Sequence, residues 1–416
     1  MTKQSLVLRT VALQLLLLGL ASMAAARDRV AVFDEVAGML EEQFYDPGMA
    51  GLDWARVTAE HRARIAPDMD REAFAAEVNG MLSRLQTSHT WLYTPDDPAW
   101  YQLAGVFMPA IPELAAELGP HLSNGAPAYV GIGVMTEQRA EGYFVTGVLH
   151  GHPAERAGVL VGDRLVAVED APFHPIRSFL GREGEEIAVA IERRPGERLT
   201  LTATPAVLDG RTMFADAMRA SVRVIEHPEA RIGYVRVWSY AGQVYQDILT
   251  RALLYGGLKD ADALVLDLRG GWGGASPVYL NLFTDQAMTF TSIRRDGTAV
   301  TFGSGWAKPV VLLVDEGARS GKELIAHGFR SLGIGPVVGE TTAGAVVSGM
   351  LNALSDGSLL YVAVADVTVA GARLEGRGVT PDIAVPFDAP YAAGADPQLE
   401  RAVAVAAERV ENRTRQ

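Results

Sequence analysis

Apolar residues follow three different patterns along the chain. Between about Val30 and Tyr93 they recur every three or four positions, which predicts amphipathic helices. The segment Asp46-Pro47-Gly48 interrupts the first helical stretch, and a strand-like pattern begins at Trp91 after the last one. We therefore expect an N-terminal helical region over residues 27–93.

A second pattern occupies residues 128–205, where short β-like runs alternate with turn residues. The first of these runs is Gly131-Ile132-Gly133-Val134. A brief helix that starts at Pro153 is expected to end at Gly158, because glycine readily takes the left-handed conformation of a helix C-cap. Together these features predict a compact β-rich domain inserted into the chain.

In the third pattern, over residues 206–388, strands alternate with helices. Residues 232–237, 263–268 and 309–314 form strongly apolar runs, as expected for strands that are covered on both faces of a parallel sheet. The Ala-rich segment 389–416 predicts a peripheral C-terminal helical tail. The expected fold class is thus mixed α/β (α+β).

The N-terminus resembles a secretory signal peptide. Lys3 and Arg9 precede an apolar stretch and then a run of small residues that ends at Ala26. An uncleaved membrane anchor is the alternative, but the apolar stretch is shorter than the roughly 20 residues that a span requires. We expect cleavage after Ala26, a secreted or periplasmic protein, and no membrane span thereafter.

Composition excludes several classes of chemistry. The 416 residues carry 37 basic and 50 acidic side chains, and a net charge of -13 without a basic run argues against a nucleic-acid partner. The chain has no cysteine, so disulfides, thiolate metal sites and cysteine nucleophiles are absent. We expect no metal and no organic cofactor, since the histidines lack metal-ligand spacing. Six of them are expected at the surface: His61, His121, His150, His152, His174 and His227.

Ser320 is a candidate nucleophile. It follows the apolar run 309–314 and precedes a helical stretch that starts at Glu323. At a helix N-terminus, free N–H groups and the helix dipole can stabilise negative charge on a bound carbonyl oxygen. The same S-x-x-E spacing also fits a capping box with Glu323, so both interpretations stand at this point.

Two further motifs suit a serine nucleophile. The segment 267–274 has glycine at four of five consecutive positions, which fits an oxyanion-hole or peptide-binding loop, or only a tight turn. It lacks the G-K-[ST] ending of a phosphate loop. His89, flanked by Ser88 and Thr90, is a candidate general base because imidazole titrates near neutral pH. A structural histidine is the alternative.

The order of these motifs resembles the C-terminal processing (tail-specific) protease superfamily, which includes the tricorn core protease. The resemblance covers about residues 30–386 and implies a ClpP/crotonase-like α/β protease core that carries a PDZ-like domain. PDZ domains bind peptide C-termini by strand addition. The matching segments are 85–90, 131–134, 153–163, 267–274, 320–323, 338–344 and 375–382.

One position departs from the bacterial tail-specific branch. That branch has a general-base lysine after the glycine of its G-E-x-T-x-G motif, where this chain has Ala345. The tricorn branch instead uses a serine–histidine pair with an assisting serine and glutamate. By this resemblance Ser320 is the nucleophile and His89 its base, with Ser88 and Glu375 orienting and polarising the histidine.

The resemblance also implies the remaining site residues. Backbone N–H groups of Gly321 and Gly273 would form the oxyanion hole, and Gly131-Ile132-Gly133 would bind substrate. Glu340 lies in another family motif and is the alternative to Glu375 as the supporting carboxylate.

These expectations combine into an exported serine peptidase that acts on proteins or peptides and captures their chain termini through the PDZ-like domain. A homo-oligomer is left open. The alternative is a catalytically inactive protein on the same fold that binds peptides or hydrophobic ligands, because loss of the lysine at Ala345 would suit a decayed enzyme. Hydrolysis of a non-peptide ester would use the same residues.

Overall fold

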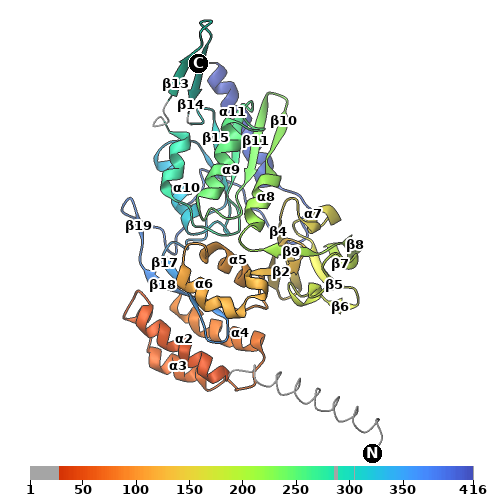
Figure 1. The fold of residues 1–416 in the computed structure, drawn as a ribbon, viewed down its shortest axis with the longest axis vertical. Helices are drawn as coiled ribbons and strands as arrows, with labels where there is room; N and C mark the ends of the chain where they lie inside the picture. Colours follow the sequence, from red (N-terminus) through yellow and green to blue (C-terminus); the bar gives the residue numbers. More distant parts are fainter. Residues whose placement is uncertain (1–27, 285–288, 304, 416) are drawn as a thin grey trace, which may run out of the picture. The chain divides into compact units, whose positions relative to one another are not determined.

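The computed structural model describes residues 28–284, 289–303 and 305–415, which form two compact units (Figure 1). The smaller unit contains the chain up to Asp96 together with Gly349–Ala365, and the larger unit contains Asp97–Ser348 and the chain from Asp366 onward. The expected mixed α/β fold is confirmed. The signal-peptide prediction falls on residues 1–26, outside the described residues. Of the helices that are described, none is long and apolar enough to cross a membrane.

The smaller unit packs helices against a three-stranded sheet. An aspartate caps the N-terminus of each of its three α-helices, where its side chain accepts a backbone N–H that has no partner within the helix. The strand order is β1-β18-β17, and β1 runs antiparallel to β18 with Trp91 opposite Tyr361. The elements are α2 (Arg29–Gln43), η1 (Met49–Gly51), α3 (Trp54–Arg62), α4 (Arg71–Leu82), η2 (Ser83–Leu85), β1 (Trp91–Tyr93), β17 (Ser348–Ala353) and β18 (Leu359–Ala365).

A six-stranded sheet forms the core of the larger unit. Its order is β10-β11-β12-β15-β16-β21, and the five strands from β11 onward are parallel, as the apolar runs predict. The edge strand β10 is antiparallel to β11, which those runs do not predict. The strands are β10 (Arg223–His227), β11 (Ala230–Arg236), β12 (Ala263–Asp267), β15 (Val310–Val314), β16 (Val337–Gly339) and β21 (Ile383–Ala384).

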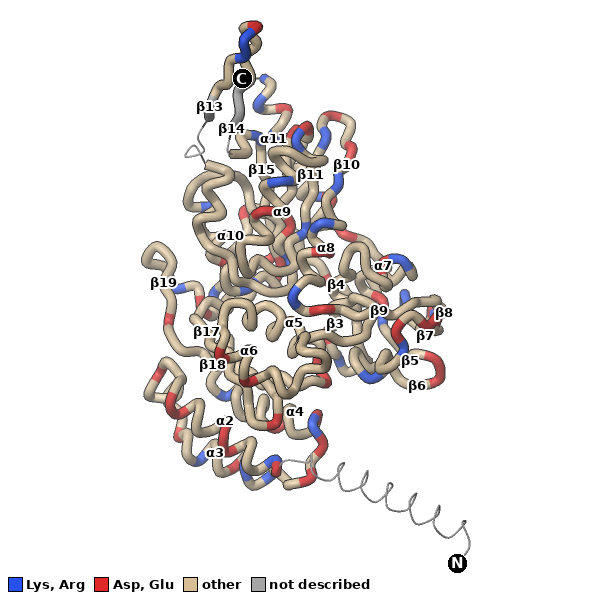
Figure 2. The backbone as a smooth tube through the Cα atoms, viewed as in Figure 1, with Lys and Arg blue, Asp and Glu red and all other residues tan. Residues whose placement is uncertain are grey.

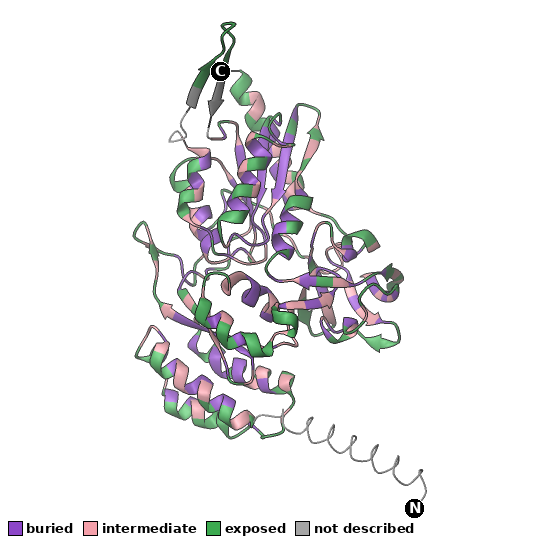
Figure 3. Ribbon diagram, viewed as in Figure 1, coloured by how far each residue is buried: buried purple, intermediate pink, exposed green. Residues whose placement is uncertain are grey.

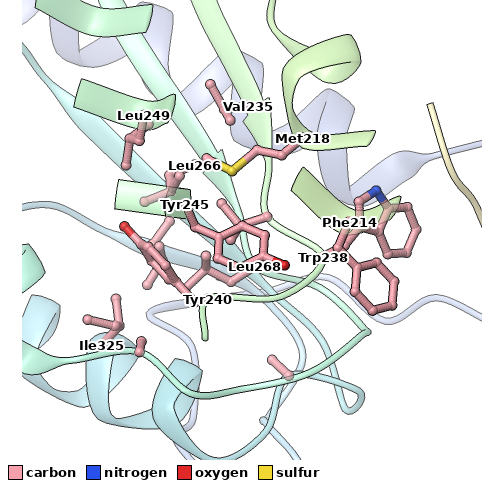
Figure 4. Packing of buried hydrophobic residues seen from close by; sticks show 14 of the residues in the cluster. Phe214, Met218, Val235, Trp238, Tyr240, Tyr245, Leu249, Leu266, Leu268 and Ile325 are labelled. Atoms are coloured by element: carbon pink, nitrogen blue, oxygen red, sulfur yellow. The ribbon is translucent and has the colours of Figure 1, made fainter. Parts of the chain in front are cut away.

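Helices cover both faces of this sheet, so β12 and β15 are buried along their whole length (Figures 1 and 3). Val310 and Leu312 belong to an apolar cluster with α8 (Met213–Ser221), α9 (Gln243–Leu254) and α10 (Gly321–Ser331), part of which Figure 4 shows. The alternate residues of β15 pack in a second cluster on the opposite face.

That opposite face is covered by α11 (Pro397–Thr414). Its residues Ala402, Val405 and Ala406 are buried against the strands, so the C-terminal helix is part of the core. The expectation of a peripheral tail helix is therefore wrong. Small apolar residues at helical spacing let this helix approach the sheet closely.

Within the larger unit, residues 128–209 form a β-rich insert with its own apolar cluster. Its strands are antiparallel, in the order β3-β4-β5-β7-β8 with β6 beside β5, while β2 pairs with β9. The predicted brief helix is confirmed, since α7 ends at Gly158 with φ of 80°. Acidic and basic residues are interspersed over the insert (Figure 2). The elements are β2 (Ala128–Gly131), β3 (Val134–Arg139), β4 (Gly142–Val148), α7 (Pro153–Ala157), β5 (Arg164–Val168), β6 (Ala171–Pro172), η5 (Arg177–Phe179), β7 (Ile187–Arg194), β8 (Glu197–Ala203) and β9 (Ala206–Asp209).

Two histidines that were expected at the surface are buried. His61 Nδ1 lies 2.6 Å from Glu77 Oε1, and His174 Nδ1 accepts the N–H groups of Ile176 and Arg177. The polar or turn contexts of these histidines in the sequence gave no sign of these partners. The remaining elements of the larger unit are α5 (Pro98–Phe107), α6 (Pro112–Leu118), η3 (Gly119–His121), η4 (Ser123–Gly125), η6 (Pro277–Phe283), β13 (Thr289–Ile293), β14 (Ala299–Gly303), β19 (Thr368–Val369) and β20 (Ala372–Arg373).

Candidate active site

Ser320 occupies the turn between β15 and α10, with φ of 56° and ψ of -126°. The Lys322 N–H donates to the Arg319 carbonyl over 3.2 Å, which closes a four-residue turn. These angles are those of the first central position of a type II′ turn, which glycine normally occupies. A serine held there stores strain of about 1–3 kcal/mol, and such strain concentrates at functional sites.

Two glycine positions at this turn have no room for a side chain. A Cβ added to Gly273 would lie 2.6 Å from the Ser320 Cβ, and one added to Gly321 would lie 2.2 Å from the Ala275 nitrogen. Both positions therefore need glycine. Within the described part of the chain, neither the Gly273 N–H nor the Gly321 N–H has a hydrogen-bond acceptor. The structure thus brings Ser320 and both predicted oxyanion donors together in the larger unit.

The loop that carries Gly273 is fixed by backbone hydrogen bonds. Gly270 and Gly271 adopt φ of 60° and 64°, which explains why glycine is present at both positions. The Gly270 N–H donates to Asp315 Oδ1 over 2.8 Å, and the Trp272 N–H donates to the Trp238 carbonyl over 2.8 Å. The loop is consequently held between the ends of β11 and β15.

Lys322 also contacts this loop, although no motif in the sequence assigned it a role. Its side chain is fully buried, and Nζ donates to the Gly270 carbonyl over 2.7 Å and to the Trp238 carbonyl over 3.2 Å. Burial lowers the pKa of Lys322 to about 7, although the nearby Asp315 opposes this shift. A signal was present in the sequence, because Lys322 precedes the buried Ile325 of α10 by one helical turn.

Glu323 ties the turn to a second loop. Oε2 accepts the N–H groups of Ser320 and Ala345 at 3.2 and 2.8 Å, and Oε1 accepts the Thr342 hydroxyl at 2.5 Å and the Gly344 N–H at 2.8 Å. Burial raises the pKa of this carboxyl, while the hydrogen bonds act in the opposite direction. The bond from Ser320 to Glu323 is one half of a capping box, so the capping and nucleophile interpretations of Ser320 are compatible.

His89 and Ser88 lie together in the smaller unit. Ser88 Oγ is 2.9 Å from His89 Nδ1. His89 has φ of 54°, so it is, like Ser320, a non-glycine residue in the left-handed region. The edge of the imidazole meets Tyr361 with ring centroids 4.9 Å apart, and a Cβ on Gly349 would lie 2.8 Å from the His89 Cβ. Strand β18 and the start of β17 thus fix the histidine.

The strand that follows His89 is anchored by a buried amide. Asn79 of α4 donates to the Leu92 carbonyl over 2.9 Å and accepts the Leu92 N–H over 2.7 Å. The side chain therefore pairs with β1 as a neighbouring strand would. These two hydrogen bonds fix the position of the strand that follows His89.

The two candidate carboxylates have different partners. Glu375 Oε2 accepts the N–H groups of Val346 and Val347 at 2.7 and 3.1 Å. Glu340 instead accepts the Phe387 N–H at 3.2 Å on Oε1 and the Gln398 amide at 2.8 Å on Oε2. Both oxygens of Glu340 are thus engaged with the segment that leads into α11.

The predicted substrate-binding segment lies in the insert. The Ile132 carbonyl accepts the Ala154 N–H over 2.7 Å, and the Gly133 carbonyl accepts the Leu149 N–H over 2.9 Å. Among the described strands of the insert sheet, β3, which begins at Val134, is an edge strand. Among the described residues, no group of three or more histidine, aspartate or glutamate side chains is arranged to hold a metal ion.

Comparison with known families gives two matches. Residues 231–385 match Peptidase family S41, and residues 25–83 match the Tricorn protease C1 domain. The first match spans the parallel strands from β11 onward, the glycine-rich loop and Ser320, and ends after Glu375.

Curated relatives show the same similarity at low identity. The chain is 27% identical over 403 residues to the putative tricorn protease homolog 2 of Streptomyces coelicolor, covering 91% of this chain and 32% of that protein. It is 24% identical over 368 residues to the chloroplastic carboxyl-terminal-processing peptidase 3 of Arabidopsis thaliana, covering 84% and 67%. For the carboxy-terminal processing protease CtpA of Bacillus subtilis, identity is 24% over 267 residues, covering 62% and 56%. The chain therefore spans between about a third and two thirds of these relatives.

Two solved structures share the fold. The tricorn protease superposes with a TM-score of 0.55 at 17% identity, covering 92% of this chain and 37% of that chain. Mature CPAF superposes with a TM-score of 0.50 at 12% identity, covering 94% and 98%.

Proposed function

The chain belongs to peptidase family S41, and on that premise we propose that it is a serine-type peptidase with Ser320 as its nucleophile. One observation supports the proposal more strongly than the others. Ser320 is held in a strained turn at the start of α10, beside the N–H groups of Gly273 and Gly321, which have no acceptor among the described residues. A serine hydroxyl next to two such donors is suited to acyl transfer.

The proposed chemistry follows from these positions. Ser320 Oγ attacks the carbonyl carbon of the scissile peptide bond, and the carbonyl oxygen takes up negative charge. The Gly273 and Gly321 N–H groups and the positive end of the α10 dipole stabilise this charge. Collapse of the intermediate expels the amine and leaves an acyl-enzyme, which water hydrolyses.

His89 is the proposed general base for Ser320. It would take the hydroxyl proton on Nε2 and return it to the leaving amine, because Nδ1 is bound to Ser88. In the tricorn branch that this chain resembles, a serine–histidine motif has this role, and Ser88-His89 matches that motif.

Glu375 is the proposed supporting carboxylate for His89. It binds the backbone of Val346 and Val347, just before the segment that carries Gly349. Both oxygens of Glu340 have other partners, so we assign Glu340 a structural role at the start of α11.

We further propose that the insert is PDZ-like and binds substrate C-termini. In a trans peptide the C=O and N–H point in opposite directions, so the inward carbonyls of Ile132 and Gly133 turn the N–H groups of Gly133 and Val134 the other way. These donors would bind a terminal carboxylate, while the edge strand β3 pairs with the peptide. The N-terminal sequence supports export to the periplasm or the exterior.

Active-site labelling tests the proposal. A fluorophosphonate probe should label the purified wild-type protein, and Ser320→Ala should abolish labelling. His89→Ala should slow it by about 10²–10⁴-fold, which is the usual contribution of a general base. The control is Ser331→Ala, since Ser331 lies at the other end of α10 and, among the described residues, its hydroxyl bonds only to the His327 carbonyl within that helix.

The outcomes separate the candidate functions. Labelling that persists in Ser320→Ala would show that Ser320 is not the nucleophile. A folded wild-type protein that stays unlabelled but binds peptides would favour the inactive ligand-binding alternative.

A further inference from the structure

We propose that Lys322 is a positioning residue that joins the two halves of the oxyanion hole, an inference that rests on the proposed function of Ser320. Lys322 follows Gly321 in the chain, and Gly321 supplies one of the two proposed oxyanion-hole N–H donors. The Lys322 side chain reaches the loop of Gly273, which supplies the other. No other residue described in the structure makes both connections.

The contacts of the ammonium group fix the glycine-rich loop from one side. Nζ lies 2.7 Å from the Gly270 carbonyl and 3.2 Å from the Trp238 carbonyl. The Gly270 N–H is held on its other side by Asp315 at 2.8 Å. Since the Trp272 N–H also donates to the Trp238 carbonyl, the three peptides before Gly273 have little freedom to rotate.

A packing role does not explain this lysine. Its side chain is 0% exposed, and among the described residues its amine nitrogen has backbone carbonyls, not carboxylates, as hydrogen-bond partners. Lysines are almost never fully buried without a charged partner, because losing the hydration of an ammonium is unfavourable. Leucine or methionine would fill the same volume without that penalty. The side chain is therefore present for its N–H donors, two of which meet backbone carbonyls.

This arrangement predicts where Lys322 acts in the reaction. Binding of an uncharged acyl group requires only that the site is open. Stabilising the negative oxygen requires the Gly273 N–H to point at it, since such bonds weaken steeply as they lose alignment. Loss of the ammonium should therefore slow the bond-forming step and leave the preceding association unchanged.

The test is the concentration dependence of fluorophosphonate labelling in Lys322→Met. The probe places its phosphoryl oxygen where a substrate oxyanion would form. We expect the maximal labelling rate to fall about 10- to 100-fold, a smaller loss than removal of a donor itself. The probe concentration for half-maximal rate should stay within about twofold, which a general loss of folded structure would not produce.

A matched variant controls for stability. Val405→Ala removes buried methyl groups from α11 on the opposite face of the sheet and should destabilise the fold without touching the loop. It is expected to label at the wild-type rate. If it slows as much as Lys322→Met at equal folded fraction, the positioning role is refuted.

A second variant covers the case in which Lys322→Met does not fold. Lys322→Gln retains an N–H for one carbonyl but is too short to reach both, so it should fold and label at least about threefold more slowly. Wild-type rates in either folded variant overturn the inference and leave the function of Ser320 intact. A wild-type protein that the probe does not label removes the proposed function, and the inference with it.

Discussion

The Ser320 N–H donates to the Ala345 carbonyl over 2.9 Å. Ala345 is the position at which the resembling tail-specific branch carries its general-base lysine, and in this chain it bonds the candidate nucleophile through its backbone. An alanine side chain cannot take a proton, so a peptidase built on Ser320 needs its base from another segment. His89 with its Ser88 partner is the proposed source.

Replacing Ser320 by glycine should stabilise the fold relative to replacing it by alanine. Both variants lack the hydroxyl, but only alanine keeps the left-handed strain at φ of 56°. Relief of this backbone strain stabilises the glycine variant by about 1–3 kcal/mol. The greater flexibility of glycine in the unfolded chain offsets part of this gain, so the net difference in unfolding free energy is about 1 kcal/mol in favour of glycine. Urea denaturation of Ser320→Gly and Ser320→Ala measures this difference directly.

Ser331 supplies the opposite control for the strain argument. It lies in the last turn of α10 with ordinary helical geometry, so glycine there should be less stable than alanine by about 0.5–1 kcal/mol. Finding the alanine variant more stable at both serines would show that Ser320 stores no strain.

Glu323→Gln should be as damaging as Glu323→Ala. All four partners of this carboxylate donate hydrogen bonds, so an amide NH₂ would face donors wherever it is placed. We expect a loss of about 2–4 kcal/mol in unfolding free energy and slower labelling of Ser320, because a buried carboxylate loses several charge-assisted bonds. Calorimetry and probe labelling of the two variants provide the readouts. A Gln variant with wild-type stability would contradict the four-bond arrangement.

Gly273→Ala should abolish most probe labelling. Its new Cβ would lie 2.6 Å from the Ser320 Cβ and 2.7 Å from the Arg319 carbonyl oxygen, so the loop must move away. Loss of one oxyanion donor lowers turnover by about 10²–10³-fold. Gly257→Ala is the matched control, since a Cβ there meets nothing within 4 Å. Equal labelling of the two variants would exclude a role for the Gly273 loop.

Lys322 should make stability depend on pH in a defined direction. Its pKa is lowered to about 7 in the folded protein, so above that pH the unfolded chain binds a proton that the folded chain does not. The free energy of unfolding of the wild type should therefore rise relative to Lys322→Met between about pH 7 and about pH 9, by at most about 1.4 kcal/mol per pH unit.

Denaturation of the wild type and of Lys322→Met across that pH range gives the unfolding free energy of each protein as a function of pH. Below about pH 6 both folded and unfolded chains carry the proton, so the difference between the two proteins should become constant. A difference that stays flat from acid to alkaline pH would show that the folded protein does not disfavour the ammonium.

Local features of the fold were predictable because they depend on neighbouring residues. The helix that ends at Gly158, the parallel strands and the link between Ser320 and Glu323 each follow from a short motif or an apolar run. The structure also gathers Ser320, Gly321 and Gly273 at the ends of adjacent strands, where parallel strands bring separate motifs together.

Partners from distant segments were not predictable. Nothing around Trp91 indicates that its strand pairs with Tyr361, and nothing around Lys322 names the Gly270 carbonyl. The prolines on either side of His174 suggested an exposed turn, although its ring accepts backbone N–H groups in the interior. Such pairings depend on the topology of the whole chain, which local periodicity does not encode.

The middle strand of the β1-β18-β17 sheet has a consequence for biogenesis. A ribosome must complete residues 359–365 before the strand after His89 has a neighbour to pair with, so this sheet cannot form until the whole segment between β1 and β18 has been synthesised. A nascent or truncated chain would hold Ser320 without a seated imidazole.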